Sequence, residues 1–412
     1  MPIVFEGATI SGGVSIEPSQ ITVPGAPTIG VATATGETTA TVSFTAPASN
    51  GNSTILSYTA TSSPGGITGT LSQAGSGTIN ITGLTASTSY TFTVTATNAI
   101  GTSSPSASSN SITTDTPYTG TTKAIFGFGQ NASSTLSITN LVSNTGVVGN
   151  DVTGVGSARG FLAAAGYGTD KAIFGFGGLG SGGASKVSTT NLVSNTGVVA
   201  TDTTGVGTAR HSLAAARYGT DKAIFYGGNG SYINLVSNTG VVGSDVTPYV
   251  GEPRYGLAAA GYGTDKAIFG YGSSLNTGLN VAITNLVSNT GVVATDTTGV
   301  GTARFFLAAA GYGIDKVIFG YGYTSTFVSI TNLVSNTGVV SNDVTGVGTA
   351  RYAPAAAGYG TSGQAIFGYG AATPFTAVSM TNLVSNTGVV ATDTTGVGTA
   401  RYSLAAAGYS TS

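Results

Sequence analysis

Residues 254–272 read RYGLAAAGYGTDKAIFGYG, and residues 285–293 read NLVSNTGVV. Both stretches recur along residues 120–412 with a spacing of roughly 50 residues, which indicates one repeated structural unit. Strand-like pieces of the Lys-Ala-Ile-Phe type begin at Lys123, Lys171, Lys222, Lys266, Lys316 and Gln364. The Asn-Leu-Val-Ser-Asn-Thr-Gly piece begins at Asn140, Asn191, Asn234, Asn285, Asn332 and Asn382. The array therefore holds six copies of each piece.

Each copy has four strand-like pieces. Ala-Ile-Phe is apolar on both faces, as expected for a strand in a sheet that is covered on both sides. The Ala-Ala-Ala piece is small, which suits the innermost strand where six sheets approach one axis. The array begins on a second strand at Lys123 and ends on a first strand at 401–409. We therefore expect the last strand to pair with 123–129 and close a ring, which leaves few open sheet edges.

The array resembles kelch repeats, on the motif Arg-Tyr-x-Leu-Ala-Ala-Ala followed by Lys-Ala-Ile-Phe-Gly-Tyr-Gly. It lacks the outer-strand Trp of that family and has Val-Val in its place. The resemblance implies a six-bladed kelch-like β-propeller over residues 120–412, closed by the C-terminal strand.

Residues 24–116 have short alternating strands with turn signals between them, the pattern and size of a β-sandwich. The stretch resembles a fibronectin type III domain, on Pro24 and Pro27, the run 42–44, Leu84 and the run 90–94. Phe44 takes the place of the usual Trp, and Leu84 with Tyr90 fits a tyrosine corner. The predicted fold class is all-β: a fibronectin type III-like sandwich followed by the propeller, with residues 1–23 as an N-terminal docking arm.

Composition excludes several kinds of function. Charged residues are 7% of the chain and the net charge is −2, so non-specific binding to nucleic acid, which needs many phosphate contacts, is not expected. No stretch reaches the roughly 18 apolar residues of a membrane span. Cys is absent, which removes disulfides and thiolate metal sites. The N-terminus lacks the pattern of a secretory signal, so we expect folding in a cytosol.

An enzyme is not expected either, and we predict no catalytic residue, metal or cofactor. His211 is the single histidine, in a slot that other repeats fill with Gly, Tyr or Phe. Asp170, Asp221, Asp265 and Asp315 each precede a Lys in a turn; we favour solvated turn pairs over a ring of cation-binding carboxylates. The remaining Asp residues of the repeats are too dispersed to form a glycosidase pair.

The candidate binding surface is the rim that carries the variable loops 130–136, 178–186, 228–232, 273–280, 323–327 and 371–376, since divergent loops on a uniform frame present recognition surfaces. The candidate ligand-binding residues are Arg159, Arg210, Arg254, Arg304, Arg351, Arg401, Tyr232, Tyr255, Phe305, Tyr323, Phe327, Tyr352, Phe375 and Tyr402. The aromatic rings could stack on sugars. Alternatively, the arginines bond carbonyl groups as structural forks and the aromatic rings pack between sheets.

Near-identical repeats, a fibronectin-like module and very low charge together resemble virion structural proteins of tailed phages. The resemblance implies a surface-exposed tail fibre, tip or head decoration, made in the host cytoplasm. Its expected partners are other virion subunits, through the N-terminal region, and a host surface glycan or protein; homo-oligomerisation stays open. The alternatives are a cell-surface or secreted bacterial adhesin and, least favoured, an extracellular carbohydrate-active enzyme.

Overall fold

The computed structural model describes residues 20–35, 38–114, 122–246 and 251–410. The chain divides into two compact units, residues 1–117 and 118–412, each of which is described here by itself. Residues 1–19 of the predicted docking arm 1–23 lie outside the described residues. Within the described part of the arm, the backbone N–H of Thr22 donates to the carbonyl of Gly51.

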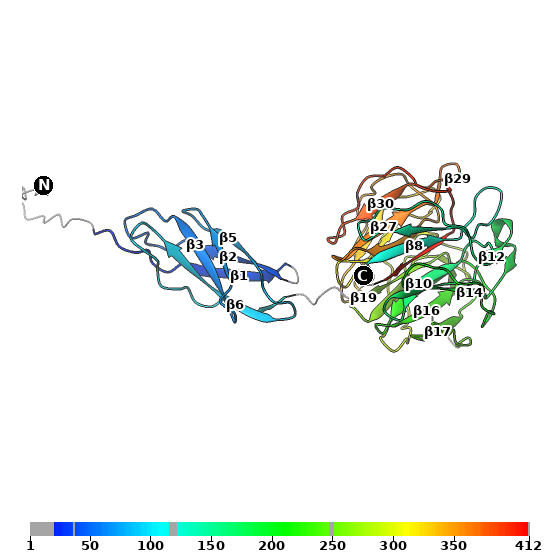
Figure 1. The fold of residues 1–412 in the computed structure, drawn as a ribbon, viewed down its shortest axis with the longest axis horizontal. Helices are drawn as coiled ribbons and strands as arrows, with labels where there is room; N and C mark the ends of the chain where they lie inside the picture. Colours follow the sequence, from blue (N-terminus) through cyan, green and yellow to red (C-terminus); the bar gives the residue numbers. More distant parts are fainter. Residues whose placement is uncertain (1–19, 36–37, 115–121, 247–250, 411–412) are drawn as a thin grey trace, which may run out of the picture. The chain divides into compact units, whose positions relative to one another are not determined.

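The first unit is a sandwich of two antiparallel sheets, and Figure 1 labels β1, β2, β3, β5 and β6. One sheet has the order β1-β2-β5, with β1 Thr28–Ala34, β2 Thr39–Thr45 and β5 Gly77–Thr82. The other has the order β4-β3-β6-β7, with β3 Ser57–Ser63, β4 Thr68–Leu71, β6 Ser89–Thr97 and β7 Ile112–Thr113. Buried residues alternate with less buried ones along β2, β3 and β6, which is the pattern of strands with one face in a core.

The sandwich core confirms the roles expected of Phe44 and Tyr90. Phe44, which takes the place of the usual Trp, packs on Tyr58 with ring centroids 4.2 Å apart. The Tyr90 hydroxyl accepts a hydrogen bond of 2.9 Å from the backbone N–H of Thr85, and Tyr90 is 3% exposed. Tyr90 is thus a packing residue that ties a corner of the sandwich.

A serine-rich segment replaces most of the last strand of the sandwich. Ser103, Ser106 and Ser109 each donate a backbone N–H to a carbonyl of β6. Their hydroxyls accept from the backbone N–H groups of Ala96, Val94 and Phe92 at 2.9–3.0 Å. The three-residue spacing of these serines therefore provides side-chain acceptors where a regular strand would use carbonyls.

The second unit is built from six three-stranded antiparallel sheets. In ring order they are β31-β8-β9 (Ala405–Tyr409, Lys123–Gly127, Thr139–Val142), β10-β11-β14 (Ala163–Tyr167, Lys171–Gly175, Thr190–Val193), β15-β16-β17 (Leu213–Tyr218, Lys222–Gly227, Ile233–Val236), β19-β20-β22 (Ala258–Tyr262, Lys266–Gly270, Thr284–Val287), β23-β24-β25 (Ala308–Tyr312, Lys316–Gly320, Thr331–Val334) and β26-β27-β30 (Ala355–Tyr359, Gln364–Gly368, Thr381–Val384). We call them the first to the sixth sheet.

The rim loops carry the remaining short elements. They are β12 (Gly178–Leu179) with β13 (Ser185–Lys186), β18 (Arg254–Tyr255) with β21 (Ser273–Ser274), β28 (Ala371–Ala372) with β29 (Thr376–Ala377), and a 3₁₀ turn at Ser181–Gly183. The described residues are otherwise strands, turns and bends.

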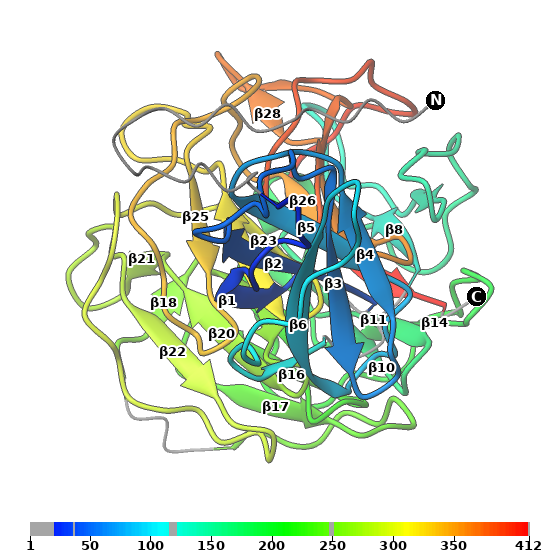
Figure 2. The ribbon, with the colours of Figure 1, turned by 90° about the vertical axis from the view of Figure 1, so that its left-hand side faces the viewer.

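The six sheets follow one another in a closed order. The first strand of each sheet contacts the first strand of the next, from β10 through β15, β19, β23 and β26 to β31, and β31 contacts β10. Figure 2 shows the sheets succeeding one another in the order of the sequence colours. The C-terminal strand β31 pairs with β8, with Ala405 opposite Gly127 and Tyr409 opposite Lys123, as expected from the phase of the repeats.

Neighbouring sheets interlock through a phenylalanine and a glycine. A Cβ built on Gly175 would lie 2.7 Å from Cζ of Phe225 in the next sheet, and one on Gly368 would lie 2.7 Å from Cζ of Phe126. Those are distances that real Cβ atoms do not occupy, so the glycine is needed for the close approach. This explains the repeated Ile-Phe-Gly sequence of the middle strands.

Backbone hydrogen bonds run around the unit in closed circuits. In one circuit the residue two positions after each repeat arginine donates its N–H to the carbonyl of the equivalent residue in the preceding sheet. The donor–acceptor pairs are Phe161–Ser403, Ser212–Phe161, Gly256–Ser212, Phe306–Gly256, Ala353–Phe306 and Ser403–Ala353, at 2.7–3.1 Å. All six residues have positive φ, between 47° and 61°. We call these six residues the belt.

A second circuit lies at the other end of the innermost strands. It joins the turns that follow them, by the donor–acceptor pairs Gly168–Asp221, Gly219–Asp265, Gly263–Asp315, Gly313–Gly363, Gly360–Thr122 and Ser410–Asp170. The described part of the chain therefore enters the ring, at Thr122, at the end opposite to the belt.

The fourth strand-like piece of each repeat does not form a regular strand. In the first sheet, bridges join Val142 to Val148 and Thr139 to Val152. The edge segment therefore has one more residue between the two bridges than β9 has. The Asn140 side chain fills the gap, since its Nδ2 donates to the Gly149 carbonyl at 3.0 Å and to Asp151 at 2.9 Å. The expectation of four regular strands per repeat is therefore corrected to three strands and a bulged edge.

Candidate binding face

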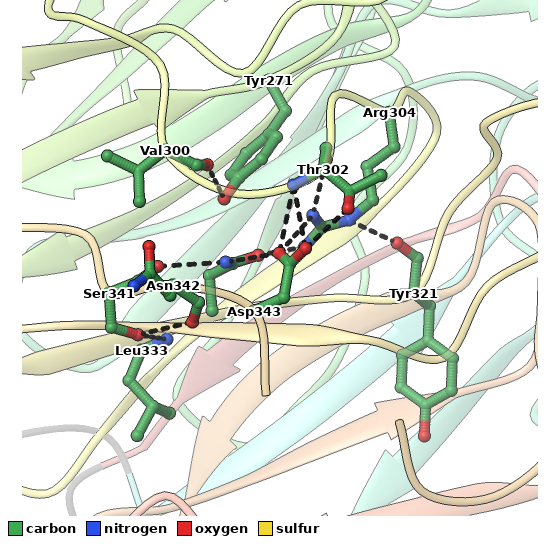
Figure 3. A network of polar contacts seen from close by, with 10 residues as sticks. Tyr271, Val300, Thr302, Arg304, Tyr321, Leu333, Ser341, Asn342 and Asp343 are labelled. Carbon is green, nitrogen blue, oxygen red and sulfur yellow. Dashed lines mark hydrogen bonds and ion pairs between the residues drawn. The ribbon is translucent and has the colours of Figure 1, made fainter. Parts of the chain in front are cut away.

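Arg304 lies at the centre of a polar network beneath the rim (Figure 3). Its Nε donates to the Tyr321 carbonyl at 2.9 Å and its Nη1 to the Thr302 carbonyl at 3.0 Å. Its Nη2 donates to Oδ1 of Asn332 at 2.7 Å, and its guanidinium carbon lies 4.4 Å from the centre of the Tyr271 ring. The guanidinium is therefore surrounded by partners from its own sheet and by a ring from the preceding sheet.

Asp343 links this network to the segment that leads into the sheet. Its Oδ2 accepts from the Thr302 hydroxyl at 2.6 Å and from the Thr302 N–H at 3.0 Å, and its Oδ1 accepts from Nδ2 of Asn332 at 2.9 Å. Nη1 of Arg304 lies 4.0 Å from Oδ1 of Asp343. The network thus fixes the inter-sheet segment against the bulged edge.

Burial and pairing with neighbouring groups shift the pKa values of Arg304 and Asp343 in opposite directions. Burial lowers the pKa of Arg304, while Tyr271 and Asp343 oppose this change. For Arg159 and Arg210 burial lowers the pKa to about 10, so both stay charged at neutral pH. Burial alone would raise the pKa of Asp343, but hydrogen bonds from Thr302 and Asn332 and the Arg304 charge together lower it. The Arg159 and Arg210 networks are therefore charged at neutral pH, and for Arg304 and Asp343 hydrogen bonds and opposite charges oppose the effect of burial on the pKa.

The arginine–asparagine hydrogen bond of this network recurs in all six sheets, whereas Arg254 and Arg351 direct Nη1 instead of Nε at the strand carbonyl and leave Nε without a hydrogen-bond partner. The arginine–asparagine pairs are Arg159–Asn191, Arg210–Asn234, Arg254–Asn285, Arg304–Asn332, Arg351–Asn382 and Arg401–Asn140. All six arginines are 0% exposed. The expectation that they touch a surface ligand is therefore corrected: their guanidinium groups lie inside, in the structural role that the sequence left open as the alternative.

Aromatic side chains form a connected cluster on the rim above these arginines. Its rings are those of Tyr255, Phe305, Phe306, Tyr323, Phe327, Tyr352, Phe375 and Tyr402, with centroids 4.9–6.3 Å apart between neighbours. We call this cluster the aromatic face. The rings come from the fourth, fifth, sixth and first sheets, so the face covers one arc of the rim.

Tyr352 is the hub of the aromatic face. It contacts Phe306 at 4.9 Å, Phe375 at 5.5 Å and Tyr402 at 6.2 Å. Burial, followed by the neighbouring Tyr402, raises the pKa of Tyr352, so its hydroxyl stays neutral. Phe375 is 55% exposed. The face thus consists of partly buried rings that support one another and one ring that projects into solvent.

Backbone pairing of the variable loops positions these rings. Phe305 and Tyr323 pair across an antiparallel bridge, and Tyr323 pairs again with Phe327. Tyr352 pairs with Ala371 at the start of the loop that carries Phe375. The loops that the sequence identified as variable are therefore held against the segments that follow the arginines, which places their aromatic residues together.

Seven of the eight aromatic residues predicted from the sequence lie in this face, and Tyr232 contacts none of its rings. Phe306 was not predicted, although it lies beside Phe305 in the sequence. Phe161 and His211 also extend the contacts, since Phe161 lies 5.7 Å from Phe306 and 5.6 Å from His211. Phe161 and Phe306 could have been found from the sequence, because both lie two residues after a repeat arginine.

The turn aspartates behave as solvated pairs. Asp170 lies 2.8 Å from Nζ of Lys171, and the equivalent pairs at Lys222, Lys266 and Lys316 lie 2.8–3.7 Å apart. Hydrogen bonding to Lys171 is the main reason that the pKa of Asp170 is lowered. No group of three or more metal-binding side chains occurs among the described residues. Nor does the described part of the chain have a helix long and apolar enough to cross a membrane.

Comparison with known proteins places one module firmly. Residues 25–112 match the fibronectin type III domain family. The chain is thus an all-β protein with a fibronectin type III domain.

Whole-chain similarity is weaker. A solved structure titled "Structure of YjhT" aligns with a TM-score of 0.47 and 10% identity over 65% of this chain and 95% of that chain. A crystal structure of titin domains aligns with 28% identity and a TM-score of 0.20 over 23% of this chain and 32% of that chain. No curated protein matches this sequence.

Proposed function

We propose that the ring of six sheets is a six-bladed β-propeller of the kelch type and that the chain is a non-catalytic attachment protein. The closed contact order of the innermost strands and the pairing of β31 with β8 support a propeller. The repeated arginine before the small Ala-Ala-Ala strand supports the kelch type. The fibronectin type III domain serves as a spacer in this proposal.

The ligand that best fits the aromatic face is a host surface glycan. The observation that carries this proposal is the continuity of the face, in which eight rings from four sheets make one apolar, uncharged surface. Aromatic rings offer a large contact area at low cost in conformational entropy, and their hydroxyls add hydrogen bonds. Backbone pairing holds the loops that carry the rings, which favours a preformed site.

The two ends of the second unit also differ in a way that suits attachment. The described chain enters the ring at Thr122, in the circuit at one end of the innermost strands, while the aromatic face lies at the belt end. We propose that the protein is a surface-exposed part of a phage virion, as the resemblance of its sequence implies; a bacterial adhesin is the second candidate and would use the same face.

Binding to a panel of host surface glycans tests the face. Phe375→Ala should weaken glycan binding at least tenfold and leave the melting temperature of the second unit within about 2 °C, because Phe375 projects into solvent. Tyr232→Ala is the matched control, since Tyr232 lies on the rim outside the face. Equal weakening by Tyr232→Ala, or capture of a host protein but no glycan, would refute the glycan site.

Labelling tests the location. An antibody raised against residues 122–410 should label the surface of the phage particle and block its adsorption. Labelling of a bacterial envelope, with no label on particles, would favour the adhesin.

A further inference from the structure

A group of polar side chains lies beside the aromatic face, on the rim loops of the first and second sheets and on the segment that leads into the third. Its members are Gln130, Lys186 and His211, and we call it the donor edge. Gln130 pairs with Tyr402 of the face through two backbone hydrogen bonds of 2.9 Å. Phe161, which lies 5.6 Å from His211, contacts Phe306 of the face at 5.7 Å. The donor edge therefore adjoins the aromatic face at two points.

The Gln130 side chain is fixed by its acceptor end and leaves its donor end unused. The residue is 3% exposed, and its Oε1 accepts a hydrogen bond of 3.3 Å from the backbone N–H of Gly182. Among the described residues, Nε2 of Gln130 has no hydrogen-bond partner, and unlike Nε of Arg254 it is not enclosed by protein atoms. Buried amides are normally bonded, so this group is a donor available to a ligand.

Lys186 is an exposed cation without an acidic partner. The lysines of the turns at the other end of the innermost strands lie 2.8–3.7 Å from aspartates, whereas Lys186 forms no ion pair with any described residue. The pairing of β12 with β13 puts Lys186 opposite Gly178, which is bridged to Gly160. A Cβ built on Gly160 would lie 3.6 Å from Cδ of Gln130. Lys186 and Gln130 are thus held on the same part of the rim.

The loop that ends at Lys186 also covers His211. A Cβ built on Gly183 would lie 3.5 Å from Cδ2 of His211 and 3.1 Å from Cδ2 of Phe161. Burial lowers the pKa of His211, and the nearby charge of Lys186 lowers it further. His211 is therefore neutral at neutral pH, and Lys186 carries the charge of the donor edge.

The carboxylates in the described part of the second unit are engaged elsewhere. Those of the arginine networks and of the turns have the partners given above, and Glu252 accepts hydrogen bonds from Ser274 and Asn276 in the fourth sheet. The donor edge therefore offers a free amide donor and an unpaired ammonium group. An ionised carboxylate matches it, because a carboxylate has acceptors alone and forms charge-assisted hydrogen bonds.

We propose that the donor edge binds the carboxylate of an acidic sugar, which makes the protein selective for uronate-containing polysaccharides. The Gln130 amide and the Lys186 ammonium group donate to the carboxylate oxygens, while a neighbouring sugar ring stacks on the aromatic face. The inference rests on the glycan-binding function proposed above and specifies its ligand.

Calorimetric titration of the full chain with tetragalacturonate and tetramannuronate, each compared with its methyl ester, tests the proposal. The ester keeps the sugar rings and removes the charge. We expect at least about a tenfold preference for one of the acids over its ester at low salt. The preference should fall as salt is added, because Lys186 is exposed. Equal affinities for acid and ester in both pairs, or binding of neutral glycans alone, overturn the proposal and leave the aromatic face intact.

Lys186→Gln should lower the preference for the acid severalfold and leave the affinity for the ester unchanged. Lys316→Gln is the matched control, because it makes the same change in net charge at an exposed lysine at the other end of the innermost strands. The control should keep the full preference. Equal losses in the two variants would show that net charge, and not the donor edge, selects the acid, which contradicts the proposal.

Gln130→Glu keeps an acceptor for the Gly182 N–H and replaces the Nε2 donor by an acceptor, so it should abolish the preference for the acid. Gln130→Met is the second variant, in case a carboxylate at this buried position disturbs folding; it should lower the preference severalfold. Unchanged preference in Gln130→Met and Lys186→Gln refutes the donor edge.

Phe375→Ala separates the donor edge from the aromatic face. It should weaken the binding of acid and ester by the same factor, because stacking on the ring does not depend on the charge. Binding of the acid that Phe375→Ala leaves unchanged would refute the aromatic face and support the donor edge. Absence of binding to every saccharide refutes the glycan function and, with it, this proposal.

Discussion

At the scale of single residues, the distribution of charge explains how a chain with so few ionisable groups folds into a large ring. The chain has 13 Lys and Arg residues, and six of the arginines are fully buried. Their partners are neutral amides, carbonyls and aromatic rings, together with a partly exposed aspartate. A guanidinium suits this position because it is planar and directs several donors at once.

Replacing one of these arginines should destabilise the second unit. Arg304→Met leaves the Tyr321 carbonyl and the Asn332 Oδ1 without their donor and removes the cation from the Tyr271 ring. We expect a loss of about 2–4 kcal/mol in the free energy of unfolding, measured by chemical denaturation. Lys316→Met is the control, since its side chain is 47% exposed and its ion pair should contribute less than about 1 kcal/mol. Equal losses would contradict a structural role for Arg304.

The sequence predicted where these arginines recur, but not whether their side chains are buried or exposed. Burial depends on Asn332 and Asp343, which come from distant parts of the repeat and reach Arg304 only when the sheet has formed. Phe306 was missed because its place at a belt position also becomes apparent only in the folded structure. The belt positions hold Phe, Ser, Gly and Ala, so nothing in the residue types indicates a shared positive φ; the shared conformation follows from the inter-sheet hydrogen bonds.

At the scale of strands and sheets, the period of the repeats was sufficient to predict six sheets and the pairing of the two ends. The middle strands are short apolar runs with a defined place in every repeat, and such runs are readable from sequence. The fourth piece was not, because the Asn140 side chain takes the place of a backbone partner. The serine-rich segment beside β6 was not predicted for a related reason, since Ser106 and Ser109 supply side-chain acceptors to β6.

The pairing of β31 with β8 should be essential to the second unit. Deleting residues 404–412 removes the innermost strand of the first sheet, which contacts both neighbouring innermost strands. It also ends the chain at Ser403 of the belt and removes the Ser410–Asp170 link of the second circuit. We expect rapid cleavage of the truncated second unit in limited proteolysis. A deletion of residues 411–412 leaves β31 in place and should resist protease as the full chain does; a protease-resistant 404–412 deletion would show that the ring does not need closure.

At the scale of the whole molecule, the two units differ in chemistry. Residues 38–114, which make up most of the sandwich, contain no Asp, Glu, Lys, Arg or His. Its stability comes from the apolar core and from neutral hydrogen bonds such as that of Tyr90. The second unit instead contains Asp151, Asp202, Asp245, Asp343 and Asp393, whose pKa values are all lowered in the folded state.

Acid should therefore destabilise one unit and spare the other. A carboxylate whose pKa is lower in the folded than in the unfolded state stabilises the fold above the unfolded value of about 3.9, and this contribution is lost as the pH falls through the folded pKa. Differential scanning calorimetry from pH 7 to pH 2 should show the transition of the second unit moving to lower temperature below about pH 4, while the sandwich transition stays nearly constant. Tyr90→Phe identifies the sandwich transition, because losing the bond to Thr85 should cost that unit about 1 kcal/mol. Asp343→Asn should reduce the acid shift of the second unit by removing one of its titrating groups, and parallel acid shifts of both transitions would show that the aspartate networks are not the source of the pH dependence.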